Sequence, residues 1–257
     1  MHLKLAGRKA VITGATKGIG RAVAETLAAE GCILHLVARS EADLTELASE
    51  LKQSGAGNVT IHALDLARSE DQQTLAGRCA QADILVNSAG DIPSGELDAL
   101  SEEQWRAGWE LKVFGYINLC REFYTAMKAR GDGVIINIIG AAGVRPDAGY
   151  IAGTTGNAAL IAFTKALGSR SVDFGVRVVG INPSLTDTPR AQRILAFKAS
   201  RNSDNPNYVN EFIAGLPLGR MCAAQEIADM AAFLASERAG YMSGTVVDVD
   251  GGTSARP

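Results

Sequence analysis

The feature that most constrains the fold is the stretch Val11–Gly20, in which a short apolar run ends in a glycine-rich turn. A helical pattern follows, with apolar residues at Ile19, Val23 and Leu27. A strand, a glycine turn and a helix in succession present free backbone N–H groups that bind a phosphate. The glycine spacing, G-x-x-x-G-x-G, differs from the G-x-x-x-x-G-K-S/T of phosphate-loop ATPases. The stretch therefore predicts a phosphate-binding turn, with a tight turn that binds no ligand as the alternative.

The rest of the chain alternates between apolar strands and amphipathic helices. Strands are expected at 32–38, 58–64, 84–86, 134–138, 176–181 and 245–249, and helices at 19–30, 41–54, 68–79, 151–173 and 224–235. Ser101 opens a further long helix with a capping box, and this helix runs to Arg130. The strands are apolar on both faces, which is typical of a parallel sheet covered by helices. The expected fold class is α/β, a doubly wound parallel sheet of about seven strands in a single domain over 1–257.

The composition argues against several classes of function. Apolar residues make up 47% of the chain and charged residues 21%, which suits a large core and not a disordered chain. The net charge of −3 disfavours nucleic acid or an anionic membrane as the main partner. No apolar run approaches the roughly 20 residues that span a bilayer. We therefore expect a cytoplasmic protein.

The cysteines and histidines form no motif for a metal or redox site. The four cysteines, at 32, 79, 120 and 222, are scattered, and no two have Cys-x-x-Cys spacing. His2 lies at the tip of the chain, whereas His35 and His62 fall within expected strands. We interpret the cysteines as reduced core residues and the histidines as structural residues, and we expect no metal.

One long segment, 182–216, has no clear periodicity. It is polar and contains the cluster Asn202, Asp204, Asn205, Pro206 and Asn207. The segment is too long for an ordinary connection between a strand and a helix. We interpret 186–213 as a flexible lid or binding segment that determines the substrate.

Several separated motifs resemble those of the short-chain dehydrogenase/reductase family. Besides the glycine turn, they are Asp65-Leu66, Asn87-Ser88-Ala89-Gly90 and Asn182-Pro183-Ser184, followed by three motifs at 217–220, 226–228 and 249–252. They cover nearly the whole chain in the family's order. The resemblance implies a Rossmann-type fold, a nicotinamide dinucleotide cofactor, oxidoreductase activity on a small molecule, and assembly as a homotetramer or homodimer.

The resemblance also assigns the cofactor contacts. Asp65 and Leu66 would flank the adenine, and residues 183–188 would hold the nicotinamide end, where Ser184 replaces the family's usual glycine. The full set of implied contacts is Gly14, Thr16, Lys17, Gly18, Ile19, Arg39, Asp65, Leu66, Asn87, Ala89, Gly90, Pro183, Ser184, Leu185 and Thr188.

Charges near the second strand predict the form of the cofactor. An NAD site needs an acidic residue at the end of this strand, where the chain has Ala38. Arg39 follows it, and Lys17 lies inside the glycine turn. Two cations at these places favour the 2′-phosphate of NADP(H), because arginine pairs bidentately with phosphate. The alternative is that both cations are solvated surface charges.

The resemblance implies four catalytic positions, and all four are substituted in this chain. The family uses an asparagine, a serine, a tyrosine and a lysine, and the matching positions carry Lys112, Gly140, Gly153 and Asn157. The tyrosine that transfers the proton is therefore missing. Tyr150, one helical turn before Gly153, and Lys112 are candidate replacements. The alternatives are a packing role for Tyr150 and a solvated or structural charge for Lys112.

Three functions remain open at this point. The first is an NADP(H)-dependent oxidoreductase with a non-standard proton donor or a substrate that needs little acid catalysis. The second is a catalytically inactive dinucleotide-binding sensor or partner subunit of a related oligomer. The third is an enzyme of another class, which no cluster of histidine, thiol or carboxylate groups in the sequence supports. We favour the first.

Overall fold

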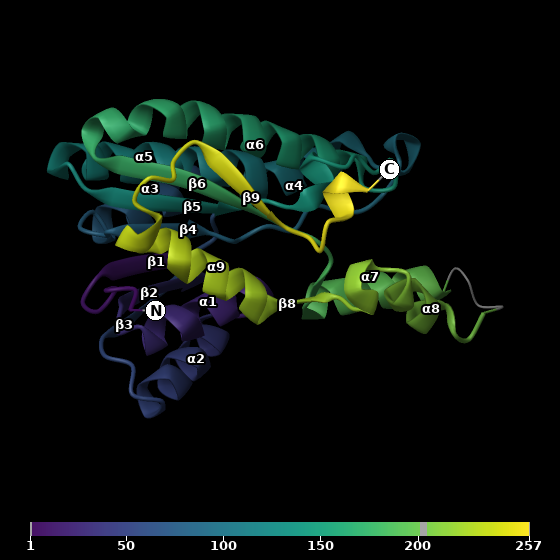
Figure 1. Cartoon of the computed structure of the whole chain (residues 1–257), viewed down its shortest axis with the longest axis horizontal. Coiled ribbons are helices and arrows are strands. Elements are labelled where there is room, and N and C mark those ends of the chain that lie inside the picture. Colours follow the sequence, from purple (N-terminus) through teal and green to yellow (C-terminus); the bar gives the residue numbers. More distant parts are fainter. Residues whose placement is uncertain (1, 201–204, 257) are drawn as a thin grey trace.

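The centre of the molecule is a seven-stranded parallel sheet (Figure 1). The computed structural model describes residues 2–200 and 205–256. The strands run in the order β3-β2-β1-β4-β5-β6-β9, so the order reverses between β1 and β4. Their bounds are β1 Lys9–Thr13, β2 Ile33–Ala38, β3 Val59–Ala63, β4 Ile84–Asn87, β5 Gly133–Ile138, β6 Val176–Pro183 and β9 Thr245–Val249. The predicted α/β class and the doubly wound sheet are confirmed.

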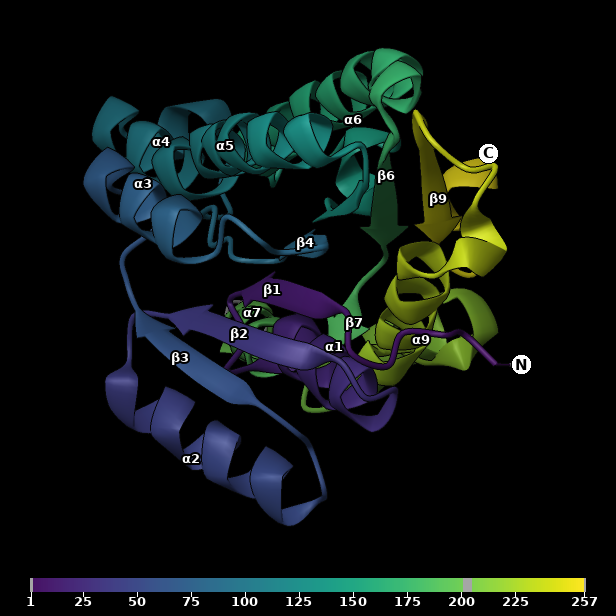
Figure 2. The ribbon, with the colours of Figure 1, turned by 90° about the vertical axis from the view of Figure 1, so that its left-hand side faces the viewer.

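Helices cover both faces of this sheet (Figure 2). One face carries α1 Gly18–Ala29, α2 Glu41–Gln53 and α9 Ala224–Ala235, and the other α3 Ser69–Arg78, α4 Glu102–Trp109, α5 Gly115–Arg130 and α6 Ile151–Ser171. Each face has its own apolar cluster, because strand residues alternate between the two sides. Leu34 and Leu36 of β2 belong to the α1/α9 cluster, whereas Val37 belongs to the α3/α5 cluster.

The long helix predicted from Ser101 onward is interrupted. Its capping box is confirmed. The Ser101 hydroxyl accepts from the backbone N–H of Gln104, and the Gln104 side-chain oxygen accepts from the backbone N–H of Ser101. A π-helical turn, Glu110–Phe114, separates α4 from α5. Such turns are frequent at functional sites. Lys112 lies at the middle of this turn.

The predicted lid is more regular than its sequence indicates. It contains α7 Pro189–Ser200 and α8 Tyr208–Ala214, preceded by β7 Thr186–Asp187, which pairs with β8 Cys222–Ala223. The expectation of an irregular segment is therefore wrong for these parts. Ala191 and Leu195 lie one helical turn apart and bury one face of α7, which stabilises it. Asn202 and Asp204 of the predicted polar cluster lie outside the described residues.

The cysteines are unpaired, as predicted. Cys32, Cys79 and Cys120 are buried, and Cys222 is half-buried. Over 2–200 and 205–256, no helix combines the length and the apolar character needed to cross a bilayer.

Candidate active site

The glycine turn between β1 and α1 has the geometry that its sequence predicts. Gly14 has φ +66°, and a Cβ atom there would lie 2.9 Å from the Cα of Ala89. A Cβ at Gly20 would lie 2.2 Å from the Gly14 carbonyl oxygen. Because no side chain fits at either place, the first turn of α1 stays open for a ligand to approach its N–H groups. The turn therefore suits the pyrophosphate of a dinucleotide.

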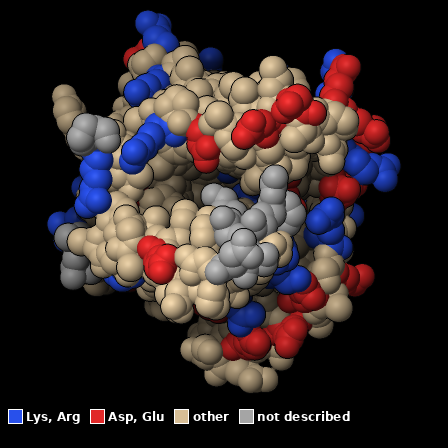
Figure 3. All heavy atoms as spheres, turned by 90° about the vertical axis from the view of Figure 1, so that its right-hand side faces the viewer, with Lys and Arg blue, Asp and Glu red and all other residues tan. Residues whose placement is uncertain are grey.

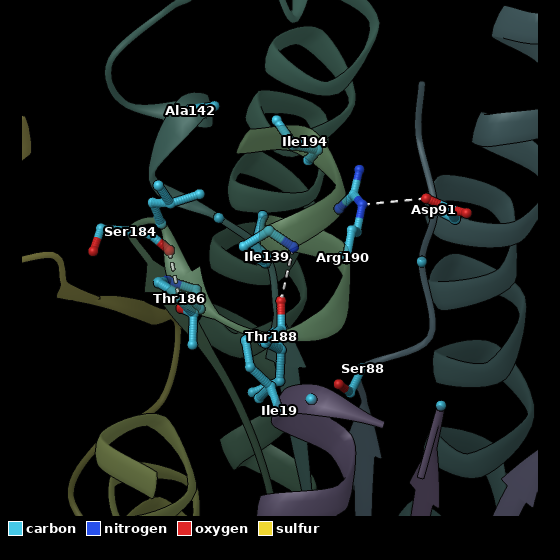
Figure 4. Close-up of a pocket in the computed structure, with 18 of the residues that line it drawn as sticks. Ile19, Ser88, Asp91, Ile139, Ala142, Ser184, Thr186, Thr188, Arg190 and Ile194 are labelled. Carbon is cyan, nitrogen blue, oxygen red and sulfur yellow. Dashed lines mark hydrogen bonds and ion pairs between the residues drawn. The ribbon is translucent and has the colours of Figure 1, made fainter. Parts of the chain in front are cut away.

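A cavity of about 1090 Å³ begins at this turn and crosses the carboxyl edge of the sheet. It includes the point where the strand order reverses, which is the usual ligand position in such sheets. All predicted cofactor residues line the cavity except Asn87. Figure 3 shows the molecule from the side that carries α7 and α8, where the surface is hollowed and charged side chains stand at the rim. Figure 4 shows residues around this cavity, among them Ile19 of α1, Ser88 after β4, Ile139 after β5 and Arg190 of the lid.

The side chain of Asn87 does not line the cavity, and its contact with the cofactor stays a prediction. Its side chain is fully buried, and its amide donates to the Oδ1 atom of Asn137 at 2.9 Å and to the Cys120 sulfur at 3.5 Å. Asn137 in turn donates to the Thr164 hydroxyl. Asn87 therefore connects β4 to β5 and to the helices behind them. The residues that follow it, Ser88, Ala89, Gly90 and Asp91, line the cavity.

The two predicted cations differ in their surroundings. Lys17 forms an ion pair with Asp43 of α2 at 2.9 Å, and its ammonium group lowers the pKa of that carboxyl group. Arg39 is exposed at the cavity wall. The sequence prediction missed Asp43. This residue lies in the first turn of α2, where an acidic side chain stabilises a helix, so its presence there does not by itself indicate a site. A 2′-phosphate would compete with Asp43 for Lys17 and would meet Arg39 directly.

Lys112 does not lie in solvent. Its ammonium group donates to the carbonyl oxygens of Ile138 at 3.2 Å and Ile139 at 2.8 Å, beside the ring of the buried Tyr116. Loss of water around the ammonium group, with a smaller effect of the Arg190 charge, lowers the pKa of Lys112 to about 7. The aliphatic part of its side chain occupies the space beside Gly90, where a Cβ would lie 2.5 Å from the Lys112 Cδ.

The ring of Tyr150 fills the space that Gly153 leaves empty. A Cβ atom on Gly153 would lie 1.9 Å from the Cζ atom of Tyr150. The Tyr150 hydroxyl lies 3.4 Å from a guanidinium nitrogen of Arg190, and both residues line the cavity. The Tyr150 ring therefore occupies the space that a side chain at residue 153 would fill.

Gly140 and Asn157, which the resemblance matches to the family's serine and lysine, lie together. A Cβ on Gly140 would lie 2.8 Å from the Asn157 amide nitrogen, and Gly140 has φ +143°, a backbone conformation that favours glycine. The Oδ1 atom of Asn157 is buried and accepts no hydrogen bond from the described residues. Gly140 and Asn157 both line the cavity and place no titratable group in it.

Arg190 of α7 is a site residue that sequence reasoning missed. It donates to the Ile92 carbonyl oxygen at 2.7 Å and forms an ion pair with Asp91 at 3.2 Å (Figure 4). These contacts attach the lid to the loop after β4. No local pattern marks an arginine in a lid helix, because its partners lie almost 100 residues earlier in the chain.

Comparisons with known proteins identify the family to which this fold and cavity belong. The family model described as short chain dehydrogenase matches residues 8–199. The chain belongs to this family. The chain is similar to L-sorbose reductase from Gluconobacter frateurii, solved with NADPH and L-sorbose, with a TM-score of 0.91, 33% identity and both chains fully covered.

Two curated relatives extend the comparison. The chain is 32% identical over 247 residues to the Escherichia coli 3-oxoacyl-acyl-carrier-protein reductase FabG, covering 96% of this chain and 97% of that protein. It is also 32% identical over 253 residues to the Bacillus subtilis 2,3-dihydro-2,3-dihydroxybenzoate dehydrogenase, covering 96% of each. All three named relatives are oxidoreductases, which supports oxidoreductase chemistry for the family fold described above.

Proposed function

We propose that this protein is an NADPH-dependent reductase of a small carbonyl compound, with Lys112 as the proton donor. The buried ammonium group of Lys112 in the cavity wall, with a pKa of about 7, is the observation that carries the proposal. The named relatives support reduction: one is a reductase of L-sorbose with NADPH, and another is a reductase of 3-oxoacyl groups.

The chain's own residues suit the phosphorylated cofactor. Gly14 and Gly20 keep the turn open for the pyrophosphate, and Arg39 is exposed at the wall where a 2′-phosphate would lie. The lid begins over the same turn, because a Cβ on Gly18 would lie 2.9 Å from the Thr188 methyl group. When bound, NADPH supplies the hydride that reduces the carbonyl carbon.

Lys112 supplies the proton. An ammonium group has three N–H donors, and two are used by the Ile138 and Ile139 carbonyl oxygens. The third is left for a substrate oxygen in the cavity. Acid catalysis is most effective when the pKa of the donor lies near the working pH, and a pKa of about 7 meets this condition.

Tyr150 and Arg190 orient the substrate in this proposal. The Tyr150 hydroxyl and the Arg190 guanidinium group lie 3.4 Å apart at the cavity wall, and both can donate to a carbonyl oxygen. Arg190 also lies in α7 of the lid, so its ion pair with Asp91 links the position of the lid to substrate binding. In this proposal Tyr150, Lys112 and Arg190 do the work of the family's catalytic residues. The positions that the resemblance matches to those residues carry Lys112, Gly140, Gly153 and Asn157.

The test is NADPH oxidation measured against ketones, quinones, enones and imines, with NADPH and NADH affinity measured by calorimetry. With a substrate found, Lys112→Met should lower kcat by about 10²–10⁴-fold, the usual contribution of acid catalysis, and leave NADPH affinity unchanged. The matched control is Lys128→Met, on α5 and outside the cavity, where Lys128 lies over the Phe174 ring.

Other outcomes separate the alternatives. Unchanged turnover in Lys112→Met would exclude Lys112 as the donor, and loss of turnover in Tyr150→Phe alone would assign the proton to Tyr150. Tight NADPH binding with no oxidation of any substrate would favour the inactive dinucleotide-binding protein. If neither nucleotide binds, the proposed function is wrong.

A further inference from the structure

A second cluster of reactive side chains lies outside the cavity. It consists of His35 on β2, His62 on β3 and Cys79, which directly follows α3. None of the three lines the cavity. Their side chains lie on the sheet face that α3 covers, because His35 and His62 alternate with the residues of the opposite apolar cluster.

The three side chains present metal-ligating atoms to one another. His35 Nδ1 lies 3.0 Å from His62 Nε2, and His62 Nε2 lies 3.6 Å from the Cys79 sulfur. All three donor atoms lie within 4.8 Å of one another. In a tetrahedral zinc site, two nitrogen ligands lie about 3.3 Å apart and a nitrogen and a sulfur about 3.6 Å, from the usual bond lengths. The two distances from His62 Nε2, 3.0 Å to His35 and 3.6 Å to Cys79, are close to these values.

The protonation states suit a cation. Burial lowers the pKa of His35 and lowers the pKa of His62 to about 4, so both imidazoles are neutral at pH 7 and have a free lone pair. Burial raises the pKa of the Cys79 thiol to about 11, so a metal ion has to displace the thiol proton when it binds. The charged neighbours are Lys9, which acts on His35, and Arg78, which acts on His62 and Cys79.

We propose that His35, His62 and Cys79 form a zinc-binding site. His35 Nδ1, His62 Nε2 and the Cys79 thiolate supply three ligands, and water takes the fourth position on the side where His35 is half-exposed. Binding of the metal releases the thiol proton of Cys79. The proton shared between His35 Nδ1 and His62 Nε2 moves to the ring nitrogen of the same imidazole that faces away from the metal. The metal then connects β2, β3 and the end of α3.

The site has a structural consequence for the cofactor end of the cavity. His62 is followed closely by Leu64, Asp65 and Leu66, which line the cavity, and His35 is two residues from Val37, which also lines it. A metal that fixes β2 against β3 therefore fixes the wall on which the adenosine end of the cofactor is expected. We expect zinc to raise the midpoint of thermal unfolding.

The probe is Co²⁺ added to chelator-treated full-length protein, followed by displacement with Zn²⁺. One Co²⁺ per chain should give a thiolate-to-metal charge-transfer band, which Cys79→Ser removes. His62→Gln and the half-exposed His35→Gln should weaken Zn²⁺ binding at least tenfold and abolish the thermal shift. The matched controls are His2→Gln, at the chain terminus, and Cys222→Ser, a thiol outside the cluster; both should bind as the unaltered protein does.

Circular dichroism checks that each variant is folded. If Cys79→Ser does not fold, His35→Gln decides, because its side chain is partly in solvent. The proposal is overturned if the unaltered protein gives no charge-transfer band, or if His35→Gln binds Zn²⁺ as tightly as the unaltered protein. The three residues would then be a hydrogen-bonded core cluster only.

Discussion

The conformation of Tyr150 depends on the absence of a side chain at residue 153. The Tyr150 ring occupies the space of a side chain at residue 153, because a Cβ atom on Gly153 would lie 1.9 Å from the Tyr150 Cζ atom. Gly153→Ala should therefore expel the ring or strain α6, and destabilise the protein by about 1–3 kcal/mol, as overpacking does. Urea unfolding measures this change.

Two further variants make the Gly153 test specific. Gly77→Ala, on α3, is the control, because a Cβ there meets no atom within 4 Å and alanine favours a helix. Adding Tyr150→Ala to Gly153→Ala should recover most of the overpacking loss. Equal destabilisation by both glycine variants would contradict the packing argument. Restoring a tyrosine at 153 would likewise require that Tyr150 be shortened.

The pKa of Lys112 predicts a pH dependence. The protonated ammonium group is the acid, so the reduction rate, kcat/KM, should be level below pH 7 and fall by about tenfold per unit above it. This fall in rate above pH 7, the alkaline limb of the profile, reports the pKa of Lys112 in the folded enzyme, where burial lowers it from its usual value. Lys112→Arg should abolish this limb, because arginine does not titrate in the range. A profile in Lys112→Arg identical to that of the unaltered enzyme would assign the limb to another group.

At the scale of elements, the start of α2 modulates the cofactor site. Asp43 holds Lys17 in an ion pair 2.9 Å long, and both residues line the cavity, as Arg39 does. Asp43→Asn should free Lys17 for a 2′-phosphate and raise NADPH affinity by roughly two- to fivefold, with NADH affinity unchanged. Calorimetry with both nucleotides measures the ratio.

The control for Asp43 is Glu46→Gln, an exposed acid on the same helix that lies outside the cavity. It removes the same charge from α2 without touching Lys17. An equal rise in NADPH affinity in both variants would mean that net charge, and not the ion pair, governs the preference. Arg39→Gln should act in the opposite direction and lower NADPH affinity.

At the scale of the whole molecule, Arg177 of β6 holds the C-terminal part against the sheet. Its guanidinium group donates to the carbonyl oxygens of Leu234, Ser236, Ala239 and Met242, at 2.9–3.4 Å. Arg177→Met would leave these acceptors unpaired, at a cost of about 3 kcal/mol or more in the free energy of unfolding. Arg170→Met, an exposed residue on α6, should change it by less than about 0.5 kcal/mol. Comparable losses in both would contradict this role.

The oligomeric state is a second prediction at this scale. The resemblance to the family implies a homotetramer or homodimer, and Phe114 and Val172 at the ends of α5 and α6 expose apolar surface. Light scattering on the purified chain should give the mass of two or four copies. A monomer at micromolar concentration would contradict the expectation.

The sequence by itself determined the elements and the glycine turn. Strand and helix bounds agree within two residues for β1 through α3, because apolar periodicity and glycine conformation are local properties. The same locality predicted Gly14, Gly18 and Gly20 as the turn residues. It also predicted Arg39 at the end of β2, where the chain lacks the acidic residue of an NAD site.

Only the tertiary structure decided how distant side chains meet. Asn87 follows the family motif but points toward Asn137, 50 residues later, and not toward the cavity. Lys17 meets Asp43, Tyr150 meets Arg190, and His62 meets His35 and Cys79, each across loops whose length no local pattern fixes. The pKa of Lys112 likewise depends on the water removed by β5 and α5 around it, which is a property of the packed molecule and not of residue type.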